Sequence, residues 1–266
     1  MSRSGAGGRW MASTVQEKDI ERFREAGYLA KKIGHRLPPA GQVIPTAEPH
    51  ERVVFLSHFV RRLGFPLHPF FHGVMYYYGI DFHDLSPNSF LNISTFIVVC
   101  EDFLRISPHF GLWLKIFNVK PKVVSGEHAE CGGSMVSKMP KVVWPTGALN
   151  DSIKQWQQKW FYITEPHGKK WVVAPEFKSR APLRLTSWPK KGPNWSSFDE
   201  LTLLQTRVQS VVDKDVKLVD VVQVMLVRMV HPCQCRACNL REYDLTEHQT
   251  LRELYDSSQG YLEGAL

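Results

Sequence analysis

The sequence predicts a mainly α-helical protein, with an N-terminal helical unit, a small β-hairpin region in the middle and helices in the C-terminal part. Two observations support this fold class. Apolar residues recur at three- and four-residue steps through most of the chain, and prolines open several of these runs. Short aromatic and β-branched runs, which are typical of strands, occur in the middle of the chain.

The chain has 266 residues, 43% of them hydrophobic, which is enough to bury a core. Changes in periodicity and composition divide it into five segments. We expect a disordered leader at 1–13, a helical unit at 14–120, a loop or boundary at 121–153, a basic aromatic segment at 154–195 and a C-terminal helical part at 196–266.

The first helices are predicted from caps and prolines. Thr14-Val15-Gln16-Glu17 fits a capping box and precedes a short helix. Residues 35–49 contain four prolines and read as an extended linker. Pro49 then opens an amphipathic helix that runs to Gly64, and Pro69 opens another that ends at Gly79.

The most regular helix follows Ser86-Pro87, a good cap and first-turn pair. Its apolar residues form one unbroken stripe, which we expect to face inward. These are Phe90, Ile93, Ile97, Cys100 and Leu104. Ser107-Pro108 repeats the same opening before a helix whose apolar face contains Phe110, Trp113, Leu114 and Phe117.

Beyond a Gly-, Ser- and Pro-rich stretch at 123–150, two short runs at 160–163 and 171–173 predict a small hairpin. Ser197 and Glu200 form a second capping box, followed by Leu201, Leu204, Val208 and Val211 on one face. Residues 216–230 favour a helix by their length, but their many valines leave a strand open. A last short helix is expected at 246–255.

The formal charge of +7 lies entirely between Lys154 and Trp195. This segment contains nine basic residues and only two acidic ones, Glu165 and Glu176. Five tryptophans are interleaved with these cations: Trp156, Trp160, Trp171, Trp188 and Trp195. Such a surface can neutralise phosphates and stack unpaired bases of RNA or single-stranded DNA. The alternative is that the tryptophans are core residues and the lysines are a solvated face. The nucleic-acid-binding candidates are Lys169, Lys170, Arg180, Arg184, Trp188, Lys190, Lys191 and Trp195.

Metal binding is not predicted. The five cysteines make an odd number in a chain without an export signal, so we expect reduced thiols. One cluster has metal-ligand residues close together, but it lacks the second paired half of a zinc ribbon or finger. It consists of Cys233, Cys235 and Cys238, with His248 further on.

No catalytic constellation is found in the sequence. Phosphate-binding and nucleophile-elbow motifs are absent, and no three acidic residues stand in the context of a metal-dependent transposase. Cys100 reads as a core residue and His109 as a cap or core contact. We therefore expect no cofactor, no small-molecule substrate and no membrane span, in an intracellular protein that is cytoplasmic or nuclear.

Several motifs follow one another in the same order as in a family of plant protein domains. It begins with Glu51-Arg52-Val53-Val54-Phe55 and Gly64-Phe65-Pro66, and continues through Cys100-Glu101-Asp102-Phe103-Leu104 and Pro108-His109-Phe110-Gly111 to Trp160-Phe161-Tyr162 and Pro232-Cys233-Gln234. This succession resembles the "putative gypsy type transposon" domain, also labelled transposase-like. The resemblance implies origin in a retrotransposon and no catalytic residues. It also implies a longer C-terminal part, so we expect residues 196–266 to be truncated.

Together these observations predict a retrotransposon-derived structural or interaction protein, Gag-like in associating with copies of itself and in contacting nucleic acid. Two alternatives remain open. One is a degenerate transposase or integrase-like enzyme, which would require three carboxylates that meet in space. The other is a host-adopted scaffold or regulatory protein.

Overall fold

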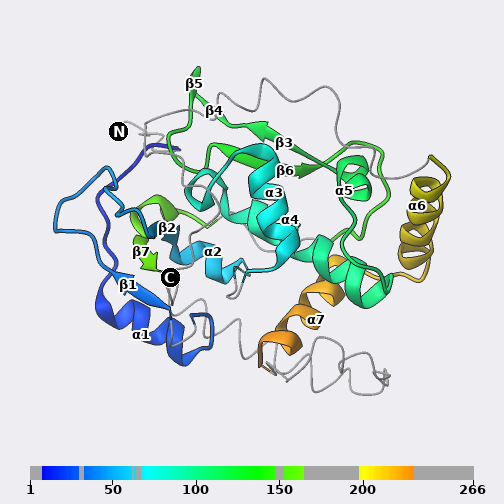
Figure 1. Cartoon of the computed structure of the whole chain (residues 1–266), viewed down its shortest axis with the longest axis horizontal. Coiled ribbons are helices and arrows are strands. Elements are labelled where there is room, and N and C mark those ends of the chain that lie inside the picture. Colours follow the sequence, from blue (N-terminus) through cyan, green and yellow to red (C-terminus); the bar gives the residue numbers. More distant parts are fainter. Residues whose placement is uncertain are drawn as a thin grey trace. The chain divides into compact units, whose positions relative to one another are not determined.

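A computed structural model describes residues 8–29, 33–61, 63, 67–147, 153–164 and 198–230. The chain forms two compact units that interleave along the sequence. Figure 1 shows their helices and strands in sequence colours. The first unit comprises Met1–Ser94, Phe117–Pro140 and Ser152–Trp195, and the second comprises Thr95–Ile116, Lys141–Asp151 and Ser196–Leu266.

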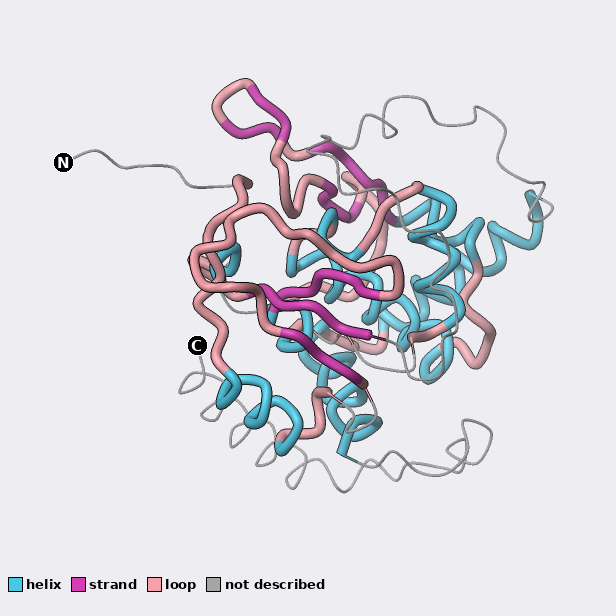
Figure 2. Tube along the Cα trace, turned by 60° about the vertical axis from the view of Figure 1, so that its left-hand side comes forward, coloured by secondary structure: helices cyan, strands magenta, loops and turns pink. Residues whose placement is uncertain are grey.

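The fold is mixed α/β, which corrects the prediction of a mainly α protein. The first unit contains a three-stranded antiparallel sheet in the order β1-β7-β2, drawn in magenta with the other strands in Figure 2. Its strands are β1 (Gly34–Arg36), β2 (Glu51–Phe55) and β7 (Trp160–Thr164). The sequence pattern predicts a helix from Pro49, but Glu51–Phe55 form a strand. All five residues of β2 are buried, so the strand lacks the polar alternation that would have distinguished it from a helix.

Two further sheets lie in the segment predicted to be a loop or boundary. Strand β3 (Phe117–Pro121) pairs with β6 (Ser134–Lys138), and β4 (Val123–Val124) pairs with β5 (Glu127–His128). Ser125 and Gly126, both with positive φ, make the tight turn between β4 and β5. The free edge of β6 is covered by two side chains of helix α4 (Pro87–Val98). Ser89 Oγ accepts a hydrogen bond from Val136 N at 2.9 Å, and Asn92 Nδ2 donates one to Val136 O at 2.9 Å.

The predicted helices of the first unit are largely confirmed. Helix α1 spans Glu17–Glu25, and α3 spans Pro69–Tyr78 and ends at Gly79, whose φ is +61°. The amphipathic run after Pro49 contributes only the short helix α2 (Leu56–Val60). Helix α4 (Pro87–Val98) begins where the Ser-Pro pair predicted.

The apolar stripe of α4 is confirmed. Phe90, Ile93, Ile97, Cys100 and Leu104 are all at most 7% exposed. The last part of this stripe is π-helical (Val99–Phe103), as Leu104 N donates to Val99 O at 2.9 Å across five residues. The unit boundary falls within α4, so Phe90 and Ile93 belong to the first unit, and Ile97, Cys100 and Leu104 belong to the second.

The second unit is helical in its described residues. Its elements are the end of α4, α5 (Phe110–Ile116), α6 (Phe198–Asp213) and α7 (Leu218–Val230). Helix α7 lies in the segment 216–230, whose length favours a helix and whose valines are also compatible with a strand. Phe96 lies between Trp113 and Trp144, with ring centroids at 5.3 and 5.9 Å. Helix α6 buries Leu204, Val208 and Val211, as predicted from their spacing.

Trp10 belongs to the core, although it lies in the segment 1–13 that composition predicts to be a disordered leader. Trp10 is 8% exposed and stacks on Phe55 at 5.7 Å. The backbone carbonyl of Met11 accepts a hydrogen bond from Trp160 Nε1 at 2.8 Å, and Ser13 Oγ donates to the backbone carbonyl of Trp160 at 2.6 Å. Composition suggested a leader because the segment has no apolar periodicity, whereas partners more than 140 residues away hold it in place.

We expect Trp10→Ala to destabilise the protein by about 3–5 kcal/mol, because it empties a packed aromatic site. Chemical denaturation followed by fluorescence measures the change. Val43→Ala, at a residue that is 45% exposed, serves as the control and should shift the free energy of unfolding by less than about 0.5 kcal/mol. Equal effects of the two substitutions would show that Trp10 is not part of the core.

Gly132 and Gly126 offer a matched pair of substitutions. Both have positive φ, so alanine costs roughly 1–2 kcal/mol at either position. A Cβ at Gly132 would also stand 2.4 Å from Trp156 Cη2, whereas one at Gly126 meets nothing within 4 Å. We expect Gly132→Ala to cost about 1–3 kcal/mol more than Gly126→Ala in the same denaturation experiment. A smaller penalty at Gly132 would contradict the packing of Trp156.

Candidate nucleic-acid interface

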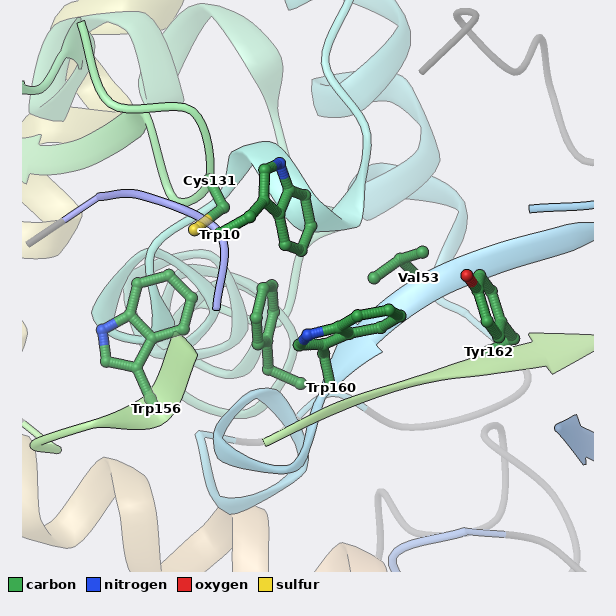
Figure 3. Close-up of a cluster of buried hydrophobic side chains, with 7 residues drawn as sticks. Trp10, Val53, Cys131, Trp156, Trp160 and Tyr162 are labelled. Carbon is green, nitrogen blue, oxygen red and sulfur yellow. The ribbon is translucent and has the colours of Figure 1, made fainter. Parts of the chain in front are cut away.

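The basic aromatic segment begins inside the core of the first unit. Trp156 and Trp160 are 7% and 0% exposed, and both belong to a cluster of buried side chains drawn in Figure 3. Trp156 meets Phe55 edge-on at 4.6 Å. Stacking on an unpaired base requires an accessible ring face, so these two tryptophans are core residues and do not bind bases. The cluster comprises Trp10, Val53, Phe55, Cys131, Trp156, Trp160 and Tyr162.

Two of the nine basic residues of this segment are described. Lys154 is exposed, and Lys159 is partly buried just before β7. The predicted strand at 171–173 and the helix at 246–255 lie outside the described residues. So do all the predicted nucleic-acid-binding residues: Lys169, Lys170, Arg180, Arg184, Trp188, Lys190, Lys191 and Trp195.

The arginines of the three-stranded sheet are engaged within the first unit. The guanidinium of Arg36 lies 3.9 Å from the ring centroid of Tyr162 and donates through Nε to Glu51 Oε1 at 2.7 Å. Burial opposes ionisation of Glu51, but its hydrogen bonds from Arg36 and from the backbone N–H of Glu48 lower the pKa of this carboxyl. Arg52 is 4% exposed and contacts Asp81, with Nε 3.3 Å from Oδ2. Both arginines are therefore paired with carboxylates of the first unit, and we do not count them among the candidate phosphate-binding residues.

Asp81 and Asp84 cap the 3₁₀ turn Phe82–Asp84. Asp81 Oδ1 accepts from Phe82 N at 2.6 Å, and Asp84 Oδ2 accepts from Asp81 N at 2.8 Å. Burial raises the pKa of Asp81, while His83 and Arg52 oppose the shift. Across the described residues, no three His, Cys, Asp or Glu side chains are placed to hold a metal ion. The cysteine-rich candidate, with Cys233, Cys235, Cys238 and His248, lies outside the described residues.

The described cysteines and two histidines have structural environments. Cys100 and Cys131 are fully buried, and burial raises the pKa of each thiol to about 12, so both remain protonated near neutral pH. His109 Nδ1 accepts from Leu112 N at 3.2 Å at the start of α5, which confirms its interpretation as a cap.

His58 is a neutral core residue. Its ring lies 4.0 Å from that of Phe90, and Nε2–H donates to Leu85 O at 3.2 Å while Nδ1 faces Phe55 N at 3.4 Å. Burial lowers the pKa of His58 well below its ordinary value, and the hydrogen bond to Leu85 only partly offsets this. It therefore carries no charge that could meet a phosphate at neutral pH.

Part of the chain matches a family model. The family described as "Putative gypsy type transposon" matches residues 53–121, from β2 to the end of β3. This confirms the resemblance over that part of the chain. The motifs quoted from Trp160 to Gln234 lie beyond the match. No curated protein and no solved structure matches the chain. None of the described helices combines the length and apolar character needed to cross a membrane.

The hairpin formed by β3, β4, β5 and β6 is not predicted from the sequence, and it carries three lysines in or beside its strands. Lys120 and Lys138 are exposed, and Lys122 is partly buried. The alternation Phe117-Asn118-Val119-Lys120, followed by the turn pair Ser125-Gly126, is a strand signal that could have indicated this hairpin.

The buried His58 predicts a dependence of stability on pH. The unfolded chain takes up a proton near pH 6.5, whereas the folded chain does so only at a lower pH, so stability should fall as pH drops below about 6.5. The slope from this group reaches at most about 1.4 kcal/mol per pH unit. Urea denaturation at about pH 7.5 and about pH 5.5 measures it.

The variant His58→Gln should lose this contribution to the pH slope, whatever its effect on absolute stability. His128→Gln, at an exposed histidine on β5, is the control and should retain the wild-type slope. Identical slopes for wild type and His58→Gln would contradict the neutral buried state.

Proposed function

We propose that this chain is a retrotransposon-derived interaction protein that acts by binding and not by catalysis, and that its basic segment, Lys154–Trp195, binds RNA or single-stranded DNA. One observation carries the proposal: the entire net charge of +7 lies in this segment, and the rest of the chain balances to zero. A charge concentrated in this way favours a polyanionic ligand, because each neutralised phosphate releases condensed counterions.

The described start of the segment supports an anchored mode of binding. Trp156 and Trp160 fix it to the core, and Lys159 directly precedes β7. Because these two indoles are buried, stacking on bases is left to the other tryptophans of the segment, with Trp188 and Trp195 as the candidates. Most of the affinity should then come from phosphate neutralisation. The family match at 53–121 supports an origin in a mobile element. In the Gag-like form of the proposal, the chain also associates with copies of itself.

A salt titration with single-stranded RNA and DNA tests the proposal. The logarithm of the binding constant should fall linearly with the logarithm of salt concentration, with a slope near −0.7 for each phosphate contact. Replacing Lys169, Lys170, Lys190 and Lys191 by Gln should flatten the slope by up to about 2.8. Trp188→Ala or Trp195→Ala should instead weaken binding by about 1–3 kcal/mol without altering the slope.

A charge-matched control removes four exposed cations elsewhere, by Gln at Lys18, Arg22, Lys214 and Lys217. It should leave the slope unchanged. If this control flattens the slope as much as the segment variant, binding is a general effect of net charge. Undetectable binding by wild type at low salt would reject the proposal and favour a host-adopted scaffold.

A further inference from the structure

The chain contains two Ser-Pro pairs, Ser86-Pro87 and Ser107-Pro108, and no Thr-Pro pair. Both pairs precede a helix, so the sequence alone gives them the same capping role. The structure places the two serines in different surroundings, because Ser86 is partly buried and Ser107 is exposed. Another protein can therefore reach the hydroxyl of Ser107 more readily than that of Ser86.

Ser86 belongs to the packed start of helix α4. Its Oγ lies 2.8 Å from Ser89 Oγ, and its backbone N–H donates to Ser134 O at 3.2 Å. Pro87, the first residue of α4, is buried. An enzyme that recognises this pair would first have to open the start of α4, so the fold protects Ser86 from modification.

The hydroxyl of Ser107 is not used by the fold. Helix α5 begins at Phe110, and its cap is His109, whose Nδ1 accepts from Leu112 N at 3.2 Å. Among the residues that the structure describes, the Ser107 hydroxyl has no hydrogen-bond partner. A group attached to this oxygen would therefore displace no contact within the described part of the chain.

The backbone around Ser107 is irregular and weakly held. Residues 104–109 lie between the π-helical turn and α5 and belong to no helix or strand. In the described part of the chain, a single backbone hydrogen bond holds residues 105–108, from Ile106 N to Cys100 O at 2.9 Å. Arg105 has a φ of +57°, which is unfavourable for a residue with a Cβ. Extension of this segment in the cleft of an enzyme would break that hydrogen bond but relieve the strain at Arg105.

The residue that follows Ser107 indicates the class of enzyme. Proline has no backbone N–H, so a pocket that offers no hydrogen-bond acceptor at this position accepts proline without leaving a donor unpaired. Protein kinases that are called proline-directed select proline directly after the serine or threonine that they phosphorylate. Pro108 is partly exposed, whereas Pro87 is buried, so only the second pair presents both its hydroxyl and its proline.

We propose that Ser107 is a phosphorylation site for a proline-directed protein kinase, with ATP as the phosphoryl donor. Ser107 Oγ attacks the γ-phosphorus of ATP, and the new Oγ–P bond replaces the bond from this phosphorus to the leaving ADP. An aspartate of the kinase accepts the hydroxyl proton. The product carries about 1.5 to 2 negative charges at neutral pH. This site goes beyond the nucleic-acid binding proposed for the basic segment and does not depend on it.

The test incubates the full chain with a purified proline-directed kinase, Mg²⁺ and ATP, and locates the phosphate by mass spectrometry. We expect about one phosphate per chain, on Ser107. Synthetic peptides of residues 81–92 and 102–113 measure the rate of each Ser-Pro pair without the fold. Ser107 in the folded chain should react within about tenfold of its peptide. Ser86 should react at least about a hundredfold more slowly than its peptide, because only opened molecules expose it.

Substitutions separate the site from effects on folding. Ser107→Ala should abolish the uptake of phosphate, and Ser86→Ala should leave it unchanged. Ser107→Thr retains a hydroxyl and should retain the uptake. Phosphate on Ser86 of the folded chain at the rate of its peptide would overturn the proposal, and so would an unreactive Ser107 in either the chain or its peptide. Equal uptake by Pro108→Ala would overturn the assignment to a proline-directed kinase. The salt titration does not involve Ser107, so the two proposals can fail separately.

Discussion

Burial of strand β7 is the constraint on which the first unit depends. Trp160 to Ile163 are fully buried, and the strand lies between β1 and β2. Trp160 also holds the N-terminal segment through the carbonyl of Met11, and Tyr162 Oη accepts from Thr46 N at 2.8 Å. Every one of these contacts joins residues more than 100 positions apart. The long chain segments between these residues must therefore be closed into loops before most of the apolar surface is buried. The sheet is consequently stable only when the whole first unit is folded.

This constraint divides the basic segment into two parts. Its first residues are used for packing, because Trp156 fills the space that Gly132 leaves free of a side chain. Its remaining cations follow β7 in the chain and account for most of the net charge. Arginines of the sheet are neutralised by Glu51 and Asp81. Both arginines of the sheet are therefore paired with carboxylates inside the first unit.

Local signals predicted the helices well and the strands poorly. A Ser-Pro pair and an unbroken apolar stripe are enough to define α4, because a helix satisfies its backbone within itself. Burial on both faces of β2 removes the alternation that distinguishes a strand from a helix, and its partner Trp160, opposite Phe55, lies over 100 residues away in the chain.

The sequence by itself determined the location of the charge, the helical stripe of α4, the cap at His109 and the resemblance later matched at residues 53–121. Each of these is a property of neighbouring residues. Tertiary structure alone decided that Trp10 belongs to the core, that Trp156 and Trp160 are unavailable to bases, and that Arg36 and Arg52 are paired. Burial and ion pairing depend on which distant segments come into contact in the folded chain. The local periodicity of the sequence does not show which segments these are.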